Sequence, residues 1–280
     1  MDQSSKLIMI NKIFVLTKMR TVLDNNNFVS YFLSDLNINQ VLSKKIKIEF
    51  LNEIFCVSCG KPIKKTFNQG HCFPCFRRLP GCDICMIKPE RCHYHKGTCR
   101  DNLWAKDNCF QSHYVYLSVT SNLKVGITRR VNIPSRWIDQ GATSALPIFE
   151  VNERFLSGII ERKIAQSFSD KTNWRKMLQI KSLEFNLFRE RDKIFSEFSF
   201  FIKKLQNLYG KNSIISLESD GVSFCYPIKQ YLSKIQTLTF NNSHVLEGRL
   251  LGIKGQYLIL ENGVFNVRKF SGYKCRFTIQ

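Results

Sequence analysis

Nine of the eleven cysteines in this 280-residue chain lie between Cys56 and Cys109. The segment has no sustained apolar period, so we expect metal ions to replace a hydrophobic core there. No apolar run is long enough to span a bilayer, and no secretory signal is visible, so a cytoplasmic protein without a membrane partner is expected. Thiols stay reduced in that compartment, and the cysteines are therefore interpreted as metal ligands before disulfides.

The first part of the cluster has the spacing of a zinc site. Cys56 and Cys59 form one Cys-x2-Cys pair, and Cys72 and Cys75 form a second pair after twelve intervening residues. Two such pairs supply four thiolates for tetrahedral zinc, and Gly60 suits the left-handed turn that follows the first pair. Four cysteine ligands leave no open position for water, which predicts a structural zinc ion.

The rest of the cluster predicts a second zinc ion, but the spacing leaves its ligands open. Cys82 and Cys85 form a third pair, which is expected to supply half of the site. Either of two further pairs is stereochemically able to complete it, Cys92 with Cys99 or Cys109 with His113. At least two zinc ions are therefore expected in total.

The formal net charge of +20 predicts a polyanionic partner. The excess of base is +2 in residues 1–55, +6 in 56–113, +5 in 114–200 and +7 in 201–280, so no acidic region offsets it. Nucleic acid, DNA or RNA, is the commonest large polyanion, although bases on an ordinary solvated surface are the alternative. The expected nucleic-acid contacts are Lys64, Lys65, Arg77, Arg78, Arg129, Arg130, Arg154, Arg175, Arg268 and Lys269.

Changes of pattern along the chain predict an α+β multidomain protein. Apolar alternation with turn residues between the runs indicates strands at both ends, and helical spacing dominates the stretch after the centre. No internal repeat at solenoid spacing is visible. The five expected parts are an N-terminal β segment (1–55), a zinc-ribbon or knuckle region (56–113), a small mixed α/β domain (114–180), a helical connector (181–210) and a small β-barrel-like domain (211–280).

The central domain is expected to contain a hairpin, two helices and a third strand. Tyr114–Val119 and Leu123–Thr128 are strand-like and flank a short turn. Pro134 can open a short helix that Gly141 closes. Leu146–Val151 is a third apolar strand, and a second helix with helical apolar spacing follows it.

In the tail, four strand-like runs are separated by turn signals, of which Asn262-Gly263 is the strongest for a hairpin. Bases and aromatic residues alternate along these runs. A small barrel that stacks nucleic-acid bases on its aromatic residues is one interpretation. An ordinary barrel with an aromatic core and lysines along its edge is the other.

The segment His113–Leu117, followed by Leu123–Thr128, resembles the opening hairpin of the GIY-YIG endonuclease superfamily. In that superfamily an arginine follows on the next helix and a glutamate lies on a later one. The resemblance implies an endonuclease fold over 114–180 with a divalent metal ion. Its implied catalytic residues are Tyr116, Lys124, Arg136 and Glu161.

The implied roles are chemically reasonable for phosphodiester hydrolysis. Glu161 can hold one Mg²⁺ or Mn²⁺ ion that keeps most of its waters. Arg136 offers a planar guanidinium that matches phosphate oxygens. By the resemblance, Tyr116 deprotonates or orients the attacking water. Lys124 stands where the superfamily has its second tyrosine, and a lysine is a poor base at neutral pH unless its pKa is lowered.

Nearly the whole chain also resembles a bacterial family of uncharacterised proteins that carry a domain of unknown function. Motifs that support this resemblance include Gln69–Cys75, Gly97–Arg100 and Arg136–Ala142. Three functions remain open from the sequence. They are a metal-dependent endonuclease with structural zinc, a noncatalytic nucleic-acid-binding protein on the same scaffold, and a nucleic-acid-modifying enzyme, acting on RNA, with a reactive second zinc site.

Overall fold

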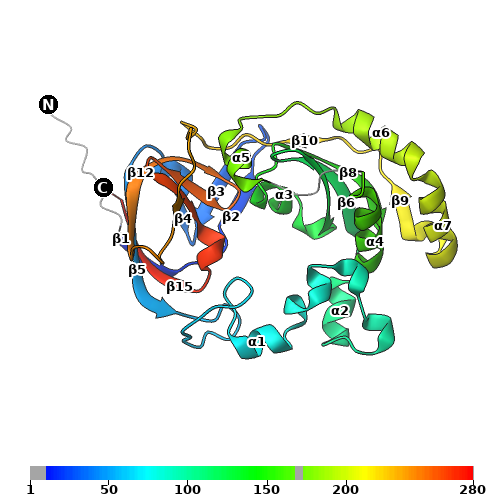
Figure 1. The fold of residues 1–280 in the computed structure, drawn as a ribbon, viewed down its shortest axis with the longest axis horizontal. Coiled ribbons are helices and arrows are strands. Elements are labelled where there is room, and N and C mark those ends of the chain that lie inside the picture. Colours follow the sequence, from blue (N-terminus) through cyan, green and yellow to red (C-terminus); the bar gives the residue numbers. More distant parts are fainter. Residues whose placement is uncertain (1–10, 168–172, 280) are drawn as a thin grey trace. The chain divides into compact units, whose positions relative to one another are not determined.

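The computed structural model describes residues 11–167 and 173–279. The chain divides into two compact units, one made of Met1–Cys75 with Tyr226–Gln280 and the other of Phe76–Cys225 (Figure 1). This division differs from the five expected parts, because the N-terminal segment and the tail share one unit and the cysteine-rich region is split between both. No helix within the described ranges has both the length and the apolar character that a membrane crossing needs.

The first unit is built on an open seven-stranded sheet that combines N-terminal and C-terminal strands. Strand β5 (Lys45–Ile54) pairs antiparallel with β12 (Val245–Lys254) on one side and with β15 (Tyr273–Ile279) on the other. The tail strands therefore form no closed barrel of their own in the described chain, and the expected barrel is wrong. The remaining strands are β1 (Asn11–Val15) beside β15, then β13 (Tyr257–Leu260), β14 (Gly263–Asn266) and β11 (Thr237–Leu238) in order beyond β12.

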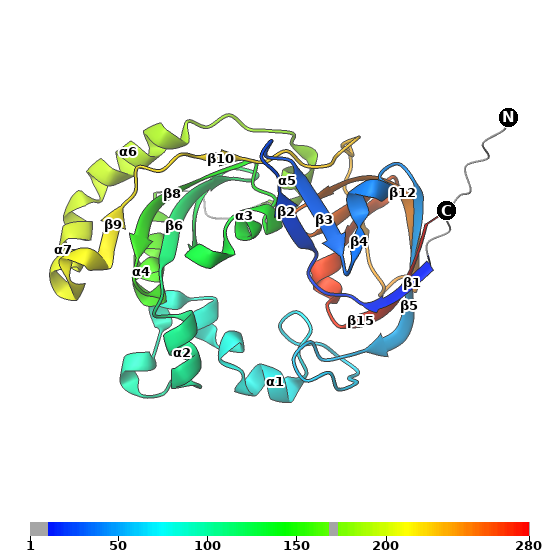
Figure 2. The same cartoon turned by 180° about the vertical axis from the view of Figure 1, so that it is seen from behind.

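The tail turns form as their sequences predict. The Asn-Gly signal lies in the hairpin that joins β13 to β14, and Gly255 has a φ of 60° in the turn that joins β12 to β13. The side chain of Gln256 is buried there and bonds both the N–H group (2.8 Å) and the carbonyl oxygen (3.1 Å) of Met19. A three-stranded sheet completes this unit and is seen best from behind (Figure 2). Its strands are β2 (Arg20–Leu23), β3 (Val29–Leu33) and β4 (Leu36–Asn37).

Aromatic side chains of the tail form the core of the first unit. Phe240, Phe265 and Phe270 are buried, and their ring centroids lie 4.9 to 5.2 Å apart. Tyr273 packs against the same group, with its centroid 5.2 Å from that of Phe270. These rings contact one another, so they do not present faces on which nucleic-acid bases can stack. Of the two interpretations of the tail aromatics, the aromatic core is the one observed.

The second unit contains the predicted hairpin, and the described part of its sheet has two short strands beyond the three expected ones. Strand β6 (His113–Val119) pairs antiparallel with β7 (Leu123–Arg129), as predicted, and with the third predicted strand, β8 (Ser144–Val151), on its other side. Two short strands that the sequence did not reveal both pair with β8. They are β9 (Ile214–Ser216) and β10 (Val222–Ser223).

Three helices pack against this sheet. Helix α4 (Arg154–Ile164) buries Leu156 and Ile160 in the same cluster as the sheet residues Val115 and Ile148. Two further helices, separated by a break at Phe198, contribute to the same cluster (Figure 1). The expected helical connector is therefore part of the core of this unit. The two helices are α6 (Leu187–Glu197) and α7 (Ser199–Tyr209).

Two shorter helices complete the central segment. Helix α3 (Ser135–Asp139) forms between Pro134 and Gly141 as expected. Helix α5 (Trp174–Gln179) is capped by Asn173, whose side chain accepts the N–H groups of two residues in its first turn. Asp170, for which the sequence left open a place in the active cleft or a capping role at the end of the Glu161 helix, lies outside the described residues.

The cysteine-rich region folds into short pieces, as its lack of an apolar period predicted. Its two α-helices have only six and seven residues, and four single 3₁₀ turns lie between them. Segments this short are not stable by themselves. The pieces are α1 (Phe73–Arg78), η2 (Pro80–Cys82), η3 (Ile84–Met86), η4 (Pro89–Arg91), η5 (Tyr94–Lys96) and α2 (Asn102–Asn108).

Candidate metal centres and the Tyr116 site

The four cysteines of the first predicted site form a cluster in the first unit. The sulfur atoms of Cys56, Cys59, Cys72 and Cys75 all lie within 4.8 Å of one another. Those of Cys59 and Cys72 are 3.8 Å apart, and a tetrahedron with Zn–S bonds of about 2.3 Å separates its sulfur atoms by about 3.8 Å. Gly60 has the predicted left-handed conformation, with a φ of 71°. The cluster can therefore hold a zinc ion.

Local hydrogen bonds favour the thiolate of Cys56, whereas the hydrogen bond with Cys72 and burial raise the pKa of Cys75 to about 12. The N–H group of Cys72 donates to the sulfur of Cys56 (3.2 Å), and that of Cys75 donates to the sulfur of Cys72 (3.4 Å). Burial raises the pKa of Cys56, but backbone N–H donors outweigh it and bring that pKa to about 6. A thiolate is the form that binds metal, and four of them leave no position for a reacting water. This centre is suited to a structural ion.

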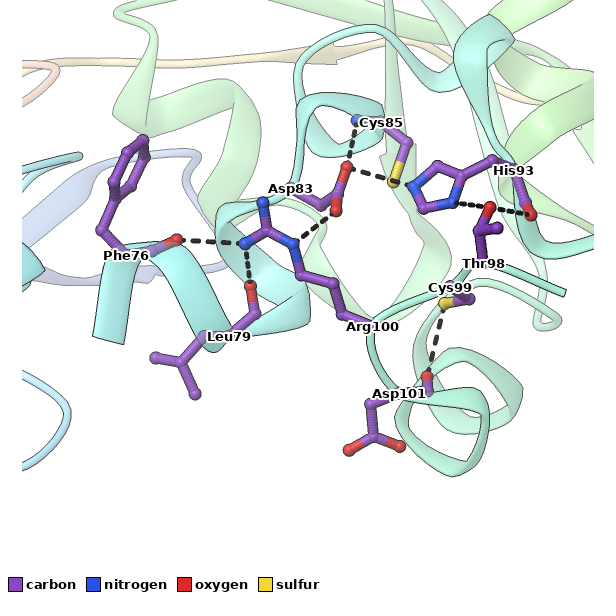
Figure 3. A network of polar contacts seen from close by, with 9 residues as sticks. All are labelled: Phe76, Leu79, Asp83, Cys85, His93, Thr98, Cys99, Arg100 and Asp101. Carbon is purple, nitrogen blue, oxygen red and sulfur yellow. Dashed lines mark hydrogen bonds and ion pairs between the residues drawn. The ribbon is translucent and has the colours of Figure 1, made fainter. Parts of the chain in front are cut away.

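A second polar cluster lies in the other unit, around the carboxylate of Asp83 (Figure 3). The Arg100 guanidinium (Nε to Oδ2, 2.6 Å) and the His93 imidazole (Nε2 to Oδ1, 3.3 Å) flank it on opposite sides. Burial raises the pKa of Asp83, but these partners and the N–H group of Cys85 lower it overall. The sequence singled out neither Asp83 nor Arg100. The outer contacts run from Arg100 Nη1 to the carbonyl oxygens of Phe76 (3.0 Å) and Leu79 (2.9 Å) and from His93 Nδ1 to Thr98 Oγ1 (2.9 Å).

Tyr116 is a fully buried residue of β6 in the second unit, and its phenol lies near three polar side chains. Its hydroxyl group donates to Oε1 of Gln140 (3.1 Å), and its phenol also interacts with the charges of Arg136 and Glu161. The ring crosses β7 at Gly126, where a Cβ atom would lie 2.7 Å from the tyrosine oxygen. The structure therefore brings three of the four implied catalytic residues, from β6, α3 and α4, into one neighbourhood.

The protonation of Tyr116 restricts what it can do. Burial raises the pKa of its hydroxyl group to about 12, against the opposing influence of Arg136. A phenol with such a pKa stays protonated at neutral pH, so it serves as a hydrogen-bond donor and not as a base. The fourth implied residue, Lys124, pairs with Ser118 across the hairpin, next to the pair of Tyr116 with Gly126. Residues two apart on a strand share a face, so Lys124 lies on the face of Tyr116.

Helix α4 carries Glu161 on a face that also packs against the cysteine-rich region of the same unit. A Cβ atom at Gly158 would lie 2.5 Å from Cβ of Pro89 and 2.8 Å from the backbone nitrogen of Glu90. Arg154, one turn earlier, donates from Nη2 to the carbonyl oxygen of Met86 (2.8 Å). Arg154 was expected to contact nucleic acid, but this guanidinium is engaged with protein backbone.

The other expected nucleic-acid contacts fall into two groups. Lys64, Lys65, Arg77 and Arg78 are exposed, and Lys65 lies over the ring of Phe67 (5.6 Å). The rest have the following contacts with protein groups. These contacts are Arg129 with Asn108 (2.7 Å), Arg130 with Glu150 (3.4 Å), Arg268 with Gln69 (2.7 Å), Arg175 over the ring of Trp174 (4.4 Å) and Lys269 over the ring of Phe270 (5.7 Å).

His113, an expected zinc ligand, is a fully buried residue at the start of β6. Its Nδ1 atom lies 2.7 Å from the carbonyl oxygen of Gln111, so Nδ1 carries the proton and Nε2 has a lone pair. Within the described chain Nε2 is buried without a hydrogen-bond partner. Protonating it would place an unpaired charge in the interior.

We expect acid to destabilise the second unit through His113. Burial lowers its pKa from 6.5 to about 4, the charges of Arg154 and Arg129 act in the same direction, and the bond to Gln111 opposes them. At a pH between these two pKa values, His113 is protonated in the unfolded chain and neutral in the folded chain. Stability therefore falls as the pH falls through this range, by up to about 3 kcal/mol.

Denaturant unfolding of the wild type and of His113→Gln at pH 7 and pH 5 measures this effect. The wild type is expected to lose about 2 kcal/mol more than the variant, because the variant has no imidazole to protonate. Equal losses in both proteins would show that His113 does not cause the acid sensitivity.

The comparisons with known proteins place the chain in a family. Residues 43–275 match the family described as "Protein of unknown function (DUF2797)", in agreement with the resemblance to uncharacterised proteins. No curated protein and no solved structure matches the chain. The matched region contains both cysteine clusters and the Tyr116 site, but the match itself gives no link to the GIY-YIG superfamily. Because it covers more than half of the chain, this protein belongs to the DUF2797 family of proteins of unknown function.

Proposed function

We propose that this protein binds nucleic acid and hydrolyses phosphodiester bonds with a divalent metal ion, and that zinc in its cysteine cluster is structural. The observation that carries the proposal is the neighbourhood of Tyr116, whose phenol interacts with both Arg136 and Glu161. A buried phenol beside a guanidinium and a carboxylate is a combination that phosphoryl transfer uses. The net charge of +20 supports a polyanionic substrate.

Each residue has a separate task in this proposal. Glu161 supplies a carboxylate for Mg²⁺ or Mn²⁺, ions that accept one protein ligand and several waters. Arg136 pairs with the phosphoryl oxygens, on which negative charge develops. Tyr116 keeps its proton and holds Gln140 and Arg136 in position. Lys124 adds a second positive charge on the same face of the sheet as Tyr116. A bound divalent ion would neutralise charge on the phosphoryl group and lower the pKa of a coordinated water.

The exposed bases near the first cysteine cluster support binding outside the reaction site. Lys64 and Lys65 can each contact a phosphate, and Phe73 of the same unit is 51% exposed. Contacts to phosphates hold nucleic acid without selecting its sequence. We therefore propose that this surface supplies affinity.

Labelled DNA and RNA, single-stranded and double-stranded, incubated with the protein and Mg²⁺ or Mn²⁺, test the proposal. We expect cleavage that Glu161→Gln slows by about 100-fold or more, because the variant loses the charge that holds the metal ion. Glu218→Gln is the matched control, since Glu218 is an exposed carboxylate of the same unit.

The outcomes separate the alternative functions. Tight binding without cleavage by the wild type would contradict the nuclease and favour a noncatalytic nucleic-acid-binding protein. An unchanged rate of cleavage in Glu161→Gln would show that the reaction takes place at another site. Neither binding nor cleavage of any tested nucleic acid would overturn the whole proposal.

A further inference from the structure

The second unit encloses a small cavity whose wall contains four cysteines. The cavity has a volume of about 20 Å³, and Cys85, Cys92, Cys99 and Cys109 all line it. Such a volume holds one species of the size of a water molecule. The four residues come from separate places along the chain, on or next to η3, η4, η5 and α2. The folding of this region therefore brings four sulfur-bearing side chains around a space for a single ion.

The four thiols lie close enough to affect one another. Cys85 interacts electrostatically with Cys92 and Cys109, and Cys109 interacts with Cys92 and Cys99. Thiols that approach one another without forming a disulfide repel when they ionise, unless a cation lies between them. All four are free cysteines. Among the described residues the four sulfur atoms do not all lie within 4.8 Å of one another, so a shared ion would draw their side chains together around the cavity.

A partly buried cation near these thiols also favours negative charge among them. Arg154 interacts with Cys109 and Cys85 as well as with Glu161, and its Nε atom is buried without a hydrogen-bond partner in the described residues. A buried guanidinium is costly unless an anion compensates it. Zinc bound by four thiolates carries a net charge of −2, and this charge would stabilise Arg154.

We propose that Cys85, Cys92, Cys99 and Cys109 bind a second, structural zinc ion. This site goes beyond the proposed function, because it does not depend on nucleic acid or on cleavage. Four thiolates complete the tetrahedral shell that zinc prefers, so neither Asp83 nor His93 is needed as a ligand. Asp83 is instead held by Arg100 at 2.6 Å and by His93 at 3.3 Å.

The proposed ligands differ from both ligand sets that the sequence left open. Cys82 and His113 do not line the cavity, although the Cys-x2-Cys spacing had joined Cys82 to Cys85. Asp83, between the two cysteines, accepts the N–H group of Cys85 (3.4 Å) in a tight turn. The proposed set keeps both members of the pair Cys92 with Cys99 and takes Cys109 from the other pair, so all four ligands are cysteines.

Zinc analysis of the purified full-length protein tests the site. We expect two zinc ions per chain in the wild type and one in Cys99→Ser. Cys82→Ser is the matched control, since Cys82 is a buried cysteine of the same region and should leave both ions bound. His93→Gln should also leave both bound. One zinc ion in the wild type, or a loss in Cys82→Ser equal to that in Cys99→Ser, would overturn the proposal.

X-ray absorption at the zinc edge of the wild type gives a test that does not depend on a variant folding. Two four-cysteine sites predict only sulfur neighbours, at about 2.3 Å. A site made by Asp83, Cys85 and His93, whose ligand atoms lie within 4.8 Å of one another, would add nitrogen and oxygen neighbours at about 2.0–2.2 Å. Such neighbours would overturn the four-cysteine assignment.

Discussion

Cys72→Ser is expected to remove one zinc ion and to unfold the loop between Cys56 and Cys75. The described loop has no strand or helix before α1, only isolated bridges such as that between Phe67 and His71. Structural zinc contributes about 10–16 kcal/mol of binding free energy in small zinc-binding peptides, which exceeds the typical stability of a whole domain. Losing a ligand at the centre of the cluster therefore costs several kcal/mol, or a fall of about 10 °C or more in Tm.

Zinc content, thermal unfolding and limited proteolysis of the same preparations measure this loss. The variant should contain one zinc ion fewer than the wild type and be cleaved first within the loop. Cys225→Ser is the control, because Cys225 is exposed and belongs to neither cluster. Unchanged zinc content and Tm in Cys72→Ser would rule out a structural zinc ion at this cluster.

Features that depend on neighbouring residues could be predicted from the sequence. The β6–β7 hairpin, the Asn-Gly hairpin and the four-cysteine cluster follow from turn chemistry, alternation and ligand spacing within about twenty residues. The pairing of β5 with β12 could not be predicted, since it joins Glu49 to Val245 and no local pattern marks such a partner.

The helices from 187 to 209 show the same limit. Their apolar spacing predicted helices, but a helical stripe does not say which surface covers it. The structure packs Ile194 and Ile202 against the sheet that carries Tyr116, so an expected connector is core. In the tail, alternation of bases and aromatics was compatible with two interpretations, and only the contacts of Phe265 and Phe270 decide between them.

At the candidate sites, residue types were easier to predict than contacts. The sequence named Tyr116, Arg136 and Glu161 by resemblance, but it could not reveal that Tyr116 is fully buried and therefore a poor base. It missed Gln140, which has no motif of its own. For the second cluster, the Cys-x2-Cys rule favoured Cys82, because spacing alone cannot show which side of a 3₁₀ turn a thiol occupies.

Gly158→Ala is expected to destabilise the second unit by about 1–2 kcal/mol. In an ordinary helix this change stabilises by about 0.5–1 kcal/mol, because alanine has the higher helix propensity. Here the new Cβ atom would meet Cβ of Pro89 at 2.5 Å and the backbone nitrogen of Glu90 at 2.8 Å, and backbone atoms cannot rotate away. Overpacking of this kind costs about 1–3 kcal/mol, so the sign of the effect is reversed.

Denaturant unfolding compares Gly158→Ala with Gly81→Ala, a glycine of the same unit whose Cβ atom would have its nearest neighbour at 3.9 Å, on Trp104. The second variant should be near neutral, and a stabilised Gly158→Ala would contradict the close approach of η4 to α4. The missing side chain of Gly158 leaves room on α4 beside Glu161. Since Pro89 and Glu90 occupy that room, the glycine couples the cysteine-rich region to the helix that carries the proposed metal ligand, and a substrate phosphate must approach Glu161 from another side of α4.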